Sequence, residues 1–343
     1  MNHLLIFTVF IFKQLFSTLN YFTFRRLINY FKLQLSYFLS FLGIRIYLHA
    51  SPYFISIEPA NYCNLHCPEC PVGNKNNHSP AHIIFDNKRY QKLVDELAPK
   101  LIHIIFYFQG EPLLHSQLPE MINYAHRAKL YTSTSTNAQF LTHSKTKELI
   151  LSGLDKLIIS VDGSTQETYE TYRIGGKLEK ALNGIRHVVA LKKELKSVTP
   201  LVEVQFLVLK TNEHQMMEMK QLTKSLGADR LTFKTAQLYD YEHGHKLMPT
   251  NKKYSRYEQN KNGTYQLKAK QSNHCWRLWN GAVVNSNGNV LPCCFDKLSE
   301  FSFGNINEES FINNWRNKKA SDFRGKILQN RKQFEMCRNC TSR

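Results

Sequence analysis

Three cysteines near residue 65 have a spacing that could bind a metal centre able to do chemistry. Cys63, Cys67 and Cys70 stand in the run C-N-L-H-C-P-E-C, just after a short apolar stretch. Three thiolates can hold three irons of a four-iron cluster and leave the fourth iron open, as a catalytic metal site requires. Zinc is the alternative, but zinc sites normally show a fourth ligand at close spacing, and His66 would have to fold back over its own loop. The spacing therefore favours an open iron–sulfur site.

Four more cysteines lie within residues 273–343, in positions that could close a second centre. They are Cys275, Cys293, Cys337 and Cys340, the last two forming a C-x-x-C pair. Four thiolates close a cluster completely, as in structural or electron-transfer sites, and a structural zinc is the alternative. One cysteine of the eight is left over, Cys294, which is either a buried thiol or the ligand in place of Cys293. The spacing of four residues between Gly288 and Cys293 favours Cys293 as the ligand.

A β-hairpin is predicted between Cys275 and Cys293. Asn287-Gly288 lies between the apolar pairs 283–284 and 290–291. An Asn-Gly turn between two apolar runs is a strong hairpin signal. The hairpin would bring the two cysteines near each other.

The spacing C-x-x-x-C-x-x-C resembles the signature of the radical S-adenosylmethionine (radical SAM) enzymes. The resemblance implies that Cys63, Cys67 and Cys70 bind a 4Fe–4S cluster whose open iron chelates S-adenosylmethionine. It also implies reductive cleavage of S-adenosylmethionine to a 5′-deoxyadenosyl radical, which abstracts hydrogen from a substrate. The family usually has an aromatic residue before the third cysteine, whereas this chain has Glu69. Packing against the adenine would then come from elsewhere, for instance from Tyr62.

Further positions match motifs of the same family. A G-E-P motif ends the second strand in radical SAM enzymes and holds the amino group of the methionine moiety, and an Arg in maturation-type relatives pairs with the carboxylate. Polar groups at the next two strand ends suit ribose and carboxylate contacts. The candidate cofactor-binding residues are therefore Gly110, Glu111, Pro112, Asn137, Ser160, Asp162 and Arg173. A plain turn for G-E-P and a surface charge for Arg173 are the alternatives, and no catalytic acid or base is predicted.

The C-terminal cysteines resemble the SPASM and twitch auxiliary-cluster domains of radical SAM enzymes. A full SPASM domain has extra cysteines for a second auxiliary cluster, whereas this chain stops three residues after Cys340. The resemblance implies the shorter, single-cluster, twitch-like form. Its 4Fe–4S cluster would remove an electron from a substrate radical or position the substrate.

Residues 51–236 show a repeated β–α pattern that could position these groups. Six short apolar runs predict strands at 54–57, 102–108, 130–136, 157–161, 202–209 and 231–234. Helical stretches alternate with them at 87–98, 118–128, 144–152, 177–195 and 213–226. Six βα units imply a parallel sheet with covering helices, with functional loops at the carboxyl ends of the strands. The pattern therefore predicts an α/β fold, and the family resemblance implies that it is a partial (βα)6 TIM-like barrel.

Residues 1–50 differ in composition from the rest, with five Lys or Arg and no Asp or Glu. The apolar run 4–12 is too short to span a bilayer, which takes about 20 residues, and it lacks the flanks of a signal peptide. Two basic amphipathic helices are predicted instead, near 15–21 and 27–42. They either pack on the main domain, which we favour, or lie in a membrane interface.

These patterns divide the chain into four segments. Residues 1–50 are the basic amphipathic helical segment, and residues 51–236 are the radical SAM partial barrel. Residues 237–272 are predicted to be a polar linker with little periodicity. Residues 273–343 are the small SPASM/twitch-like auxiliary-cluster domain.

The net charge and the cysteine spacing indicate which partners and which cellular compartment to expect. The formal net charge of +18 suits an anionic partner, such as an acidic peptide or an anionic membrane surface, although a basic, well-solvated surface explains it equally. Nucleic acid is disfavoured because no Arg-rich tract with interleaved aromatics occurs in mid-chain. Cysteines spaced as metal ligands need reduced thiols, which predicts a cytoplasmic setting. It would be peripheral to the inner face of the membrane if residues 1–42 contact lipid.

The expected function is a radical SAM enzyme that oxidises or cross-links a peptide or protein, or tailors a small molecule. A reductant such as flavodoxin or ferredoxin would serve it. One alternative is a membrane-associated radical SAM enzyme of cell-envelope or lipid-linked sugars, which deletion of residues 1–42 should release from membranes. Another is a non-enzymatic iron–sulfur electron carrier or zinc-binding adaptor, which would need neither the G-E-P motif nor an open iron.

Overall fold

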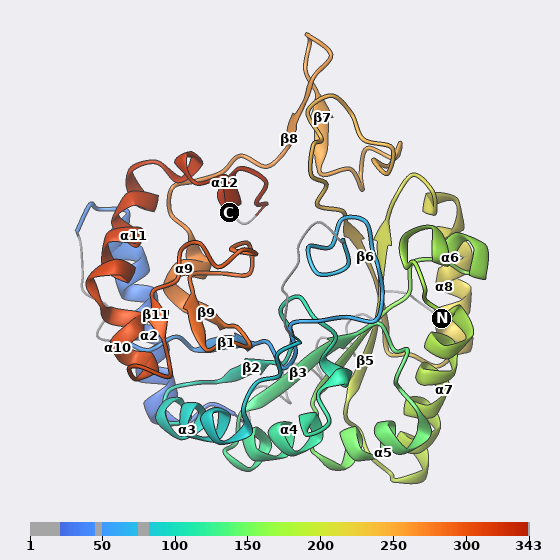
Figure 1. Ribbon diagram of the computed structural model, residues 1–343, viewed down its shortest axis with the longest axis horizontal. Coiled ribbons are helices and arrows are strands. Elements are labelled where there is room, and N and C mark those ends of the chain that lie inside the picture. Colours follow the sequence, from blue (N-terminus) through green and yellow to red (C-terminus); the bar gives the residue numbers. More distant parts are fainter. Residues whose placement is uncertain (1–20, 45–49, 75–81, 342–343) are drawn as a thin grey trace.

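The computed structural model describes residues 21–44, 50–74 and 82–341. The helix predicted near 15–21 lies almost wholly outside these residues. Within them the chain forms a curved, mostly parallel sheet with helices along its outer side (Figure 1).

The six predicted barrel strands are all present and run parallel in chain order. They are β1 (Phe54–Ile57), β2 (His103–Ile105), β3 (Tyr131–Thr136), β4 (Lys156–Ser160), β5 (Leu201–Val208) and β6 (Arg230–Thr235). In β4 the apolar Leu157 and Ile159 are fully buried toward the helices, whereas Lys156 and Ser160 are half-buried on the inner side. This alternation follows from the period of two in a strand. It places polar groups inside the partial barrel.

The covering helices agree with the predicted ones within a few residues. They are α3 (Asn87–Leu97), α4 (Leu118–Arg127), α5 (His143–Leu151), α6 (Gln166–Tyr172), α7 (Leu178–Glu194) and α8 (Met216–Ser225). The short α6 was not predicted, and the stretch before α8 is a 3-10 turn, η2 (Glu213–Gln215). Each long helix buries one apolar face, so most of the core lies between helices and sheet.

The predicted C-terminal hairpin is present, and it extends the barrel sheet. Its strands are β9 (Gly281–Val284) and β10 (Asn289–Leu291), with Gly288 at φ 88° in the turn. Strand β9 runs parallel to β1, and β11 (Gly304–Asn305) closes this side. The described strands thus form one nine-stranded sheet in the order β11-β10-β9-β1-β2-β3-β4-β5-β6. The helices of this region are α9 (Trp276–Asn280), α10 (Phe311–Arg316), α11 (Lys318–Gln329) and α12 (Glu335–Arg338).

The expectation of little regular structure in 237–272 was wrong. Strands β7 (Tyr257–Gln259) and β8 (Tyr265–Leu267) form an antiparallel hairpin in this segment, which projects at the top of Figure 1. The Asn-rich stretch between them is the hairpin turn, with Gly263 at φ 85°. The strands are short and their sequence is mostly polar, and only one face, with Tyr257, Tyr265 and Leu267, is packed against other residues.

The helix predicted at 27–42 is α2 (Phe24–Ser40), and it packs on the outside of the body. Thr23 caps it by accepting a hydrogen bond from the N–H of Arg26. No helix in the described part of the chain is both long enough and apolar enough to cross a membrane.

Candidate active site

The loop after β1 carries the first three cysteines and curls into a tight turn. The N–H of Cys70 donates to the carbonyl of Cys67 at 3.1 Å, and the N–H of Asn74 donates to the carbonyl of Cys70 at 2.7 Å. Gly73 closes the turn, because a Cβ there would lie 2.7 Å from the amide nitrogen of Cys67. The loop is therefore shaped by backbone contacts, and all three thiols border one cavity.

That cavity, of about 260 Å3, lies at the carboxyl ends of the barrel strands. It contains most of the predicted site: Cys63, Cys67, Cys70, Gly110, Glu111, Asn137, Ser160 and Arg173 all line it. Two predicted residues lie outside the lining. Pro112 begins a buried 3-10 turn, η1 (Pro112–Leu114), and Asp162 is buried behind Arg173.

Gly110 is required by the close packing of two loops. A Cβ at this position would lie 1.9 Å from the carbonyl oxygen of Ala60 and 2.9 Å from the amide nitrogen of Tyr62. The next residue continues the contact, since the N–H of Glu111 donates to the carbonyl of Tyr62 at 2.9 Å. The close approach that glycine allows here is to the cysteine loop itself.

Glu111 joins the ends of two strands through a buried carboxylate. Its Oε1 accepts from the hydroxyl of Thr136 at 2.6 Å and from the N–H of Leu113 at 3.1 Å, and its Oε2 accepts from the N–H of Asn137 at 2.9 Å. Burial raises the pKa of Glu111, and these hydrogen bonds oppose that rise. A carboxylate has about four acceptor positions, so this one retains capacity for a ligand ammonium group.

Arg173 faces the cavity from the segment after α6 and is held by Asp162. Its Nε donates to Oδ2 of Asp162 at 2.6 Å, and its Nη1 lies 3.9 Å from Sγ of Cys67. The second oxygen of Asp162 accepts from the N–H of Leu207 at 2.6 Å. Burial alone would lower the pKa of Arg173, but Asp162 and Cys67 outweigh it and raise the pKa. Arg173 therefore stays a cation beside the cysteine loop, and Asp162 orients it.

The donor set of this cavity fits a group that binds thiolates. Burial raises the pKa of Cys63 to about 12 and also raises the pKa of Cys67, against the opposing charge of Arg173. Buried thiols in such surroundings become thiolates only when a nearby cation, such as the irons of a cluster, stabilises the negative charge. Asn137 supports the loop, donating from Nδ2 to Oδ1 of Asn64 at 2.9 Å and to Sγ of Cys63 at 3.5 Å.

Several lining residues were not among the predicted site residues. Tyr107, Gln109, Tyr239 and Lys297 also border the cavity. Tyr107 lies two residues after β2, and this position at a strand end is the signal that could have found it. Tyr239 and Lys297 come from segments far along the chain, and no local pattern marks them.

The second cysteine group also converges on one small cavity. Cys275, Cys293, Cys337 and Cys340 line it together with apolar side chains and Arg331. Cys275 begins α9 and Cys337 lies in α12, whose turn is held by Gln271, which donates from Nε2 to the carbonyl of Cys340 at 2.6 Å. Burial raises the pKa of Cys337 to about 11. Four thiols in an apolar pocket fit a closed cluster.

Arg331 supplies a buried positive charge to this group. It is 1% exposed, and its Nη2 donates to Sγ of Cys340 at 3.1 Å. Burial would lower its pKa, but Cys275, Cys340 and Cys337 raise it. The guanidinium can therefore offset the negative charge of ligating thiolates, which tunes a cluster.

Cys294 points away from that cavity. It packs beside Phe108, Val283 and Leu291, and Nη1 of Arg277 lies 3.8 Å from its Sγ. Its neighbour Cys293 lines the four-cysteine cavity. Across the described residues, no three His, Cys, Asp or Glu side chains lie as the ligands of a single metal ion do.

We expect Cys293→Ala and Cys294→Ala to differ in iron content. Cys293→Ala should lose the auxiliary cluster, about four of about eight irons per chain. The reason is that Cys293 lines the four-cysteine cavity and Cys294 does not. Cys294→Ala, the adjacent thiol and matched control, should retain the wild-type iron and sulfide content. Equal loss in both variants, or loss in Cys294→Ala alone, would contradict this placement.

Comparison with known families finds a match for each of the two regions that carry the cysteine groups. A model of the radical SAM superfamily matches residues 57–222, and a model of an iron–sulfur cluster-binding domain, SPASM, matches residues 275–341. This chain belongs to the radical SAM superfamily. It is an enzyme of the SPASM-type branch, with S-adenosylmethionine and iron–sulfur clusters as cofactors. The alternatives of an electron carrier or a zinc adaptor are accordingly not supported.

Curated relatives of this radical SAM enzyme cover most of its length. The tungsten-containing aldehyde ferredoxin oxidoreductase cofactor-modifying protein of Pyrococcus furiosus is 25% identical over 84% of this chain and 87% of its own. The PqqA peptide cyclase of Gluconobacter oxydans is 25% identical over 78% of this chain and 77% of its own. Streptococcus suis SuiB bound to S-adenosylmethionine has the same fold, with a TM-score of 0.60 and 15% identity over 84% of this chain and 72% of its own.

Proposed function

We propose that this radical SAM enzyme oxidises or cross-links a peptide or protein substrate held between its two cysteine groups. Seven cysteines would bind two 4Fe–4S clusters: Cys63, Cys67 and Cys70 the catalytic one, and Cys275, Cys293, Cys337 and Cys340 the auxiliary one. A named relative, the PqqA peptide cyclase, supports a peptide substrate. Tailoring of a small molecule is the related possibility, and the cofactor-modifying relative supports it.

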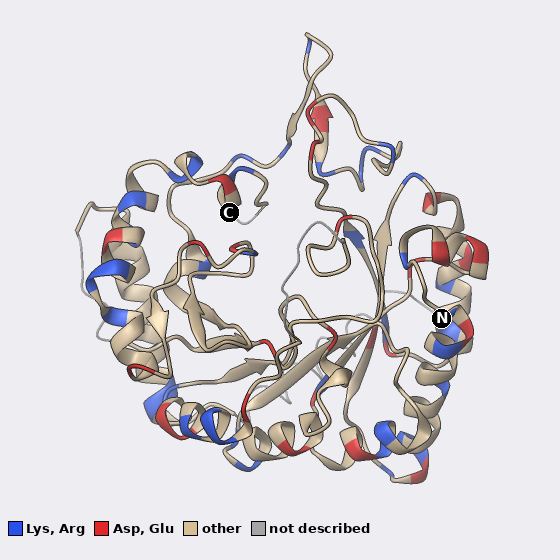
Figure 2. Ribbon diagram, in the orientation of Figure 1, with Lys and Arg blue, Asp and Glu red and all other residues tan. Residues whose placement is uncertain are grey.

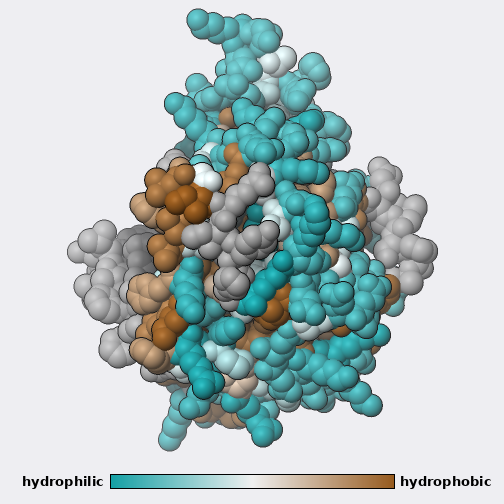
Figure 3. Space-filling view, turned by 90° about the vertical axis from the view of Figure 1, so that its left-hand side faces the viewer, coloured by the Kyte–Doolittle hydropathy of each residue, from teal (hydrophilic) through white to brown (hydrophobic). Residues whose placement is uncertain are grey.

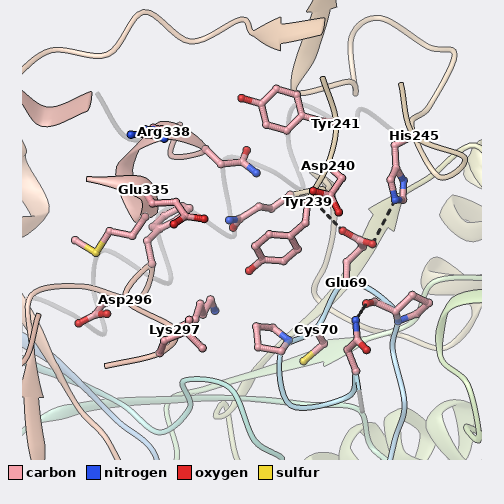
Figure 4. A pocket seen from close by; sticks show the side chains of 18 of the residues that line it. Glu69, Cys70, Tyr239, Asp240, Tyr241, His245, Asp296, Lys297, Glu335 and Arg338 are labelled. Atoms are coloured by element: carbon pink, nitrogen blue, oxygen red, sulfur yellow. Dashed lines mark hydrogen bonds and ion pairs between the residues drawn. The ribbon is translucent and has the colours of Figure 1, made fainter. Parts of the chain in front are cut away.

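The observation that carries the proposal is a larger cavity, of about 500 Å3, between the cysteine loop and the C-terminal region (Figure 4). One wall is the cysteine loop with Glu69 and Cys70, and the opposite wall is the α12 turn with Glu335 and Arg338. This cavity and the 260 Å3 cavity share Cys70, Tyr239 and Lys297. A substrate in the larger cavity would therefore lie beside Cys70 and against Glu335, Met336 and Arg338, which flank Cys337 in the α12 turn.

Glu69 lies at the boundary between the larger and the smaller cavity. Its Oε2 accepts from the N–H of Tyr239 at 2.8 Å, and its Oε1 lies 3.4 Å from Nε2 of His245 (Figure 4). The residue that departs from the family motif thus fastens the segment after β6 to the cysteine loop. The Tyr239 side chain is placed at the boundary of the two cavities.

The charge of the larger cavity favours a substrate with cationic groups. Its lining includes the carboxylates of Glu69, Asp240, Glu242, Asp296, Glu300 and Glu335, against the cations Lys297 and Arg338. This local sign is opposite to the net charge of +18. The expectation of an acidic substrate rested on net charge alone, and the lining favours a Lys- or Arg-containing peptide instead.

The residues of the smaller cavity would bind and orient S-adenosylmethionine, which with its cluster supplies a hydrogen-abstracting radical. Glu111 would accept from the ammonium group, and Arg173 would donate to the carboxylate from the guanidinium that Asp162 holds. Ser160 and Asn137 would contact the ribose or the carboxylate. Gly110 keeps the cysteine loop against the strand end, and Pro112 begins the turn that follows.

Reduced thiols are needed throughout, and all eight cysteines are free of disulfides. This supports a cytoplasmic enzyme that receives its electrons from flavodoxin or ferredoxin. Nucleic acid is not proposed as a partner.

We expect two electron paramagnetic resonance signals from the anaerobically reconstituted and reduced protein. One should shift when S-adenosylmethionine is added, because only the three-cysteine cluster has an open iron. Incubation with Lys- or Arg-containing peptides, and with acidic peptides as controls, would then be followed by 5′-deoxyadenosine release and by peptide mass. A single signal that ignores S-adenosylmethionine would overturn the proposal.

A second candidate is a membrane-associated radical SAM enzyme of cell-envelope or lipid-linked sugars. The exposed apolar side of α2 is the observation that favours it. It would be chosen over the first if reconstituted enzyme released 5′-deoxyadenosine with lipid-linked saccharides and not with peptides.

A further inference from the structure

Helix α2 is packed with its polar side inward. Its buried residues are Arg26, Asn29, Leu33, Ser36 and Ser40, of which only Leu33 is apolar. A surface helix normally turns its apolar stripe to the core and its polar residues to water. Here that arrangement is reversed.

Specific hydrogen bonds hold α2 in this orientation. Arg26 donates to the carbonyls of Ala98 at 2.8 Å and Ala128 at 3.0 Å, and also to that of Lys129. Asn29 exchanges two bonds with the backbone of Ser51, at 2.8 and 2.9 Å. Arg26 thus binds carbonyls at the ends of α3 and α4, where a cation is favoured. Rotating α2 to hide its apolar side would leave these buried donors and acceptors unpaired, which is unfavourable.

The outward side of α2 is a continuous apolar stripe. It consists of Phe24, Ile28, Phe31, Leu35, Phe38 and Leu42, at the three- and four-residue spacing of one helix face. Phe24 is 77% exposed, Phe31 65% and Phe38 62%. The helix of 17 residues is about 25 Å long. Such a continuous exposed stripe marks an interaction surface.

The charged side chains of α2 itself are all positive. Residues 1–50 contain no Asp or Glu, and Arg25 and Lys32 are exposed on α2 itself. Lys and Arg also lie along α3 and α11, together with Asp95, Glu96 and Asp322, and Figures 1 and 2 place these helices on the same side of the molecule as α2. Hydrophobic side chains gather on this side among the hydrophilic ones (Figure 3).

We propose that the apolar stripe of α2 docks the enzyme on an anionic phospholipid bilayer. An interfacial helix needs an apolar side that enters the headgroup region and basic residues that meet anionic lipid. The stripe and its flanking cations supply both. A protein surface of mixed charge is a poorer match, because its basic groups would find no acidic partner on α2, where all charged side chains are positive. This docking is independent of the proposed reaction.

The test is co-sedimentation of the full chain with vesicles. We expect binding to phosphatidylglycerol-containing vesicles, and at least about tenfold weaker binding to pure phosphatidylcholine vesicles or at 1 M salt, where the screening length is short. The double variant Phe31→Ser/Phe38→Ser should lose at least about tenfold in binding to the anionic vesicles. Both positions are exposed, so the variant should keep the wild-type unfolding temperature.

The matched control is Leu151→Ser, which removes an equally exposed apolar side chain, 63% exposed, at the end of α5. It should bind vesicles as the wild type does. Wild-type binding by the double variant would overturn the proposal, and would assign any lipid affinity to residues outside the stripe. A dimer by light scattering that the double variant disrupts, without vesicle binding, would assign the stripe to a second copy and also overturn it.

Discussion

Cys67→Ala is expected to abolish reductive cleavage of S-adenosylmethionine while leaving the auxiliary cluster in place. Cys67 lines the smaller cavity, is 6% exposed and is one of the three thiols proposed to hold the catalytic cluster. Iron should fall by about four of about eight atoms per chain. 5′-Deoxyadenosine release should fall by more than about a hundredfold, because even the loss of a partner that only contacts a ligand costs 10–100-fold. Iron analysis and chromatography measure the two effects.

The control for Cys67→Ala is Cys293→Ala, which removes a ligand of the other group. It should lose the same amount of iron and yet keep the signal that responds to S-adenosylmethionine. If Cys67→Ala retained that signal, or if Cys293→Ala lost it, the roles assigned to the two cavities would be wrong.

Gly110→Ala is expected to destabilise the protein and to impair loading of the catalytic cluster. The new Cβ would lie 1.9 Å from the carbonyl oxygen of Ala60, which is backbone and cannot move as a flexible side chain could. Overpacking of this kind costs about 1–3 kcal/mol, and sometimes more. The loop must shift, and it carries Cys63 only three residues after Ala60. Denaturant unfolding and iron content after reconstitution measure both consequences.

Gly263→Ala controls for the loss of a glycine as such. No atom lies within 4 Å of a Cβ built there, so its cost is limited to the positive φ of 85°, about 1 kcal/mol. Cluster loading should be that of the wild type. Normal loading and stability in Gly110→Ala would mean that the two loops are not packed as described.

Local patterns were sufficient to predict most of the barrel. Strand β1 was predicted with its observed bounds, because three of the four residues 54–57 before the cysteine loop are apolar. Most helices were found from their amphipathic spacing. Since parallel strands end at one edge, residues from four strand ends were expected together, and the 260 Å3 cavity brings them together.

Contacts between side chains could not be predicted in the same way. Asp162 and Arg173 were both assigned to S-adenosylmethionine, whereas in the structure they bind each other at 2.6 Å. Residue type shows that a carboxylate needs a donor, but not which donor. Likewise, Glu69 was recognised only as a departure from the motif, and its partners Tyr239 and His245 lie about 170 residues further on.

The long-range pairing of β9 with β1 was also missed. Apolar pairs beside Asn287-Gly288 predicted the hairpin, and nothing in them indicates which strand it joins. The pairing of β9 with β1 requires a residue without a side chain at position 281. Gly281 pairs with Phe54, and a Cβ on Gly281 would lie 2.3 Å from the Phe54 ring.

This pairing makes the barrel and the C-terminal region hard to separate. A chain cut after residue 236 would leave β1 as an unprotected edge strand, with a row of free N–H and C=O groups and the apolar Ile55 and Ile57 beside it. Such edges recruit strands from other molecules and lead to aggregation. The carboxylate of Glu58 would also lose its hydrogen bonds from Ser286. Deleting the auxiliary-cluster region is therefore a poor way to ask what that cluster does, and cysteine substitutions that leave the sheet intact are the better instrument.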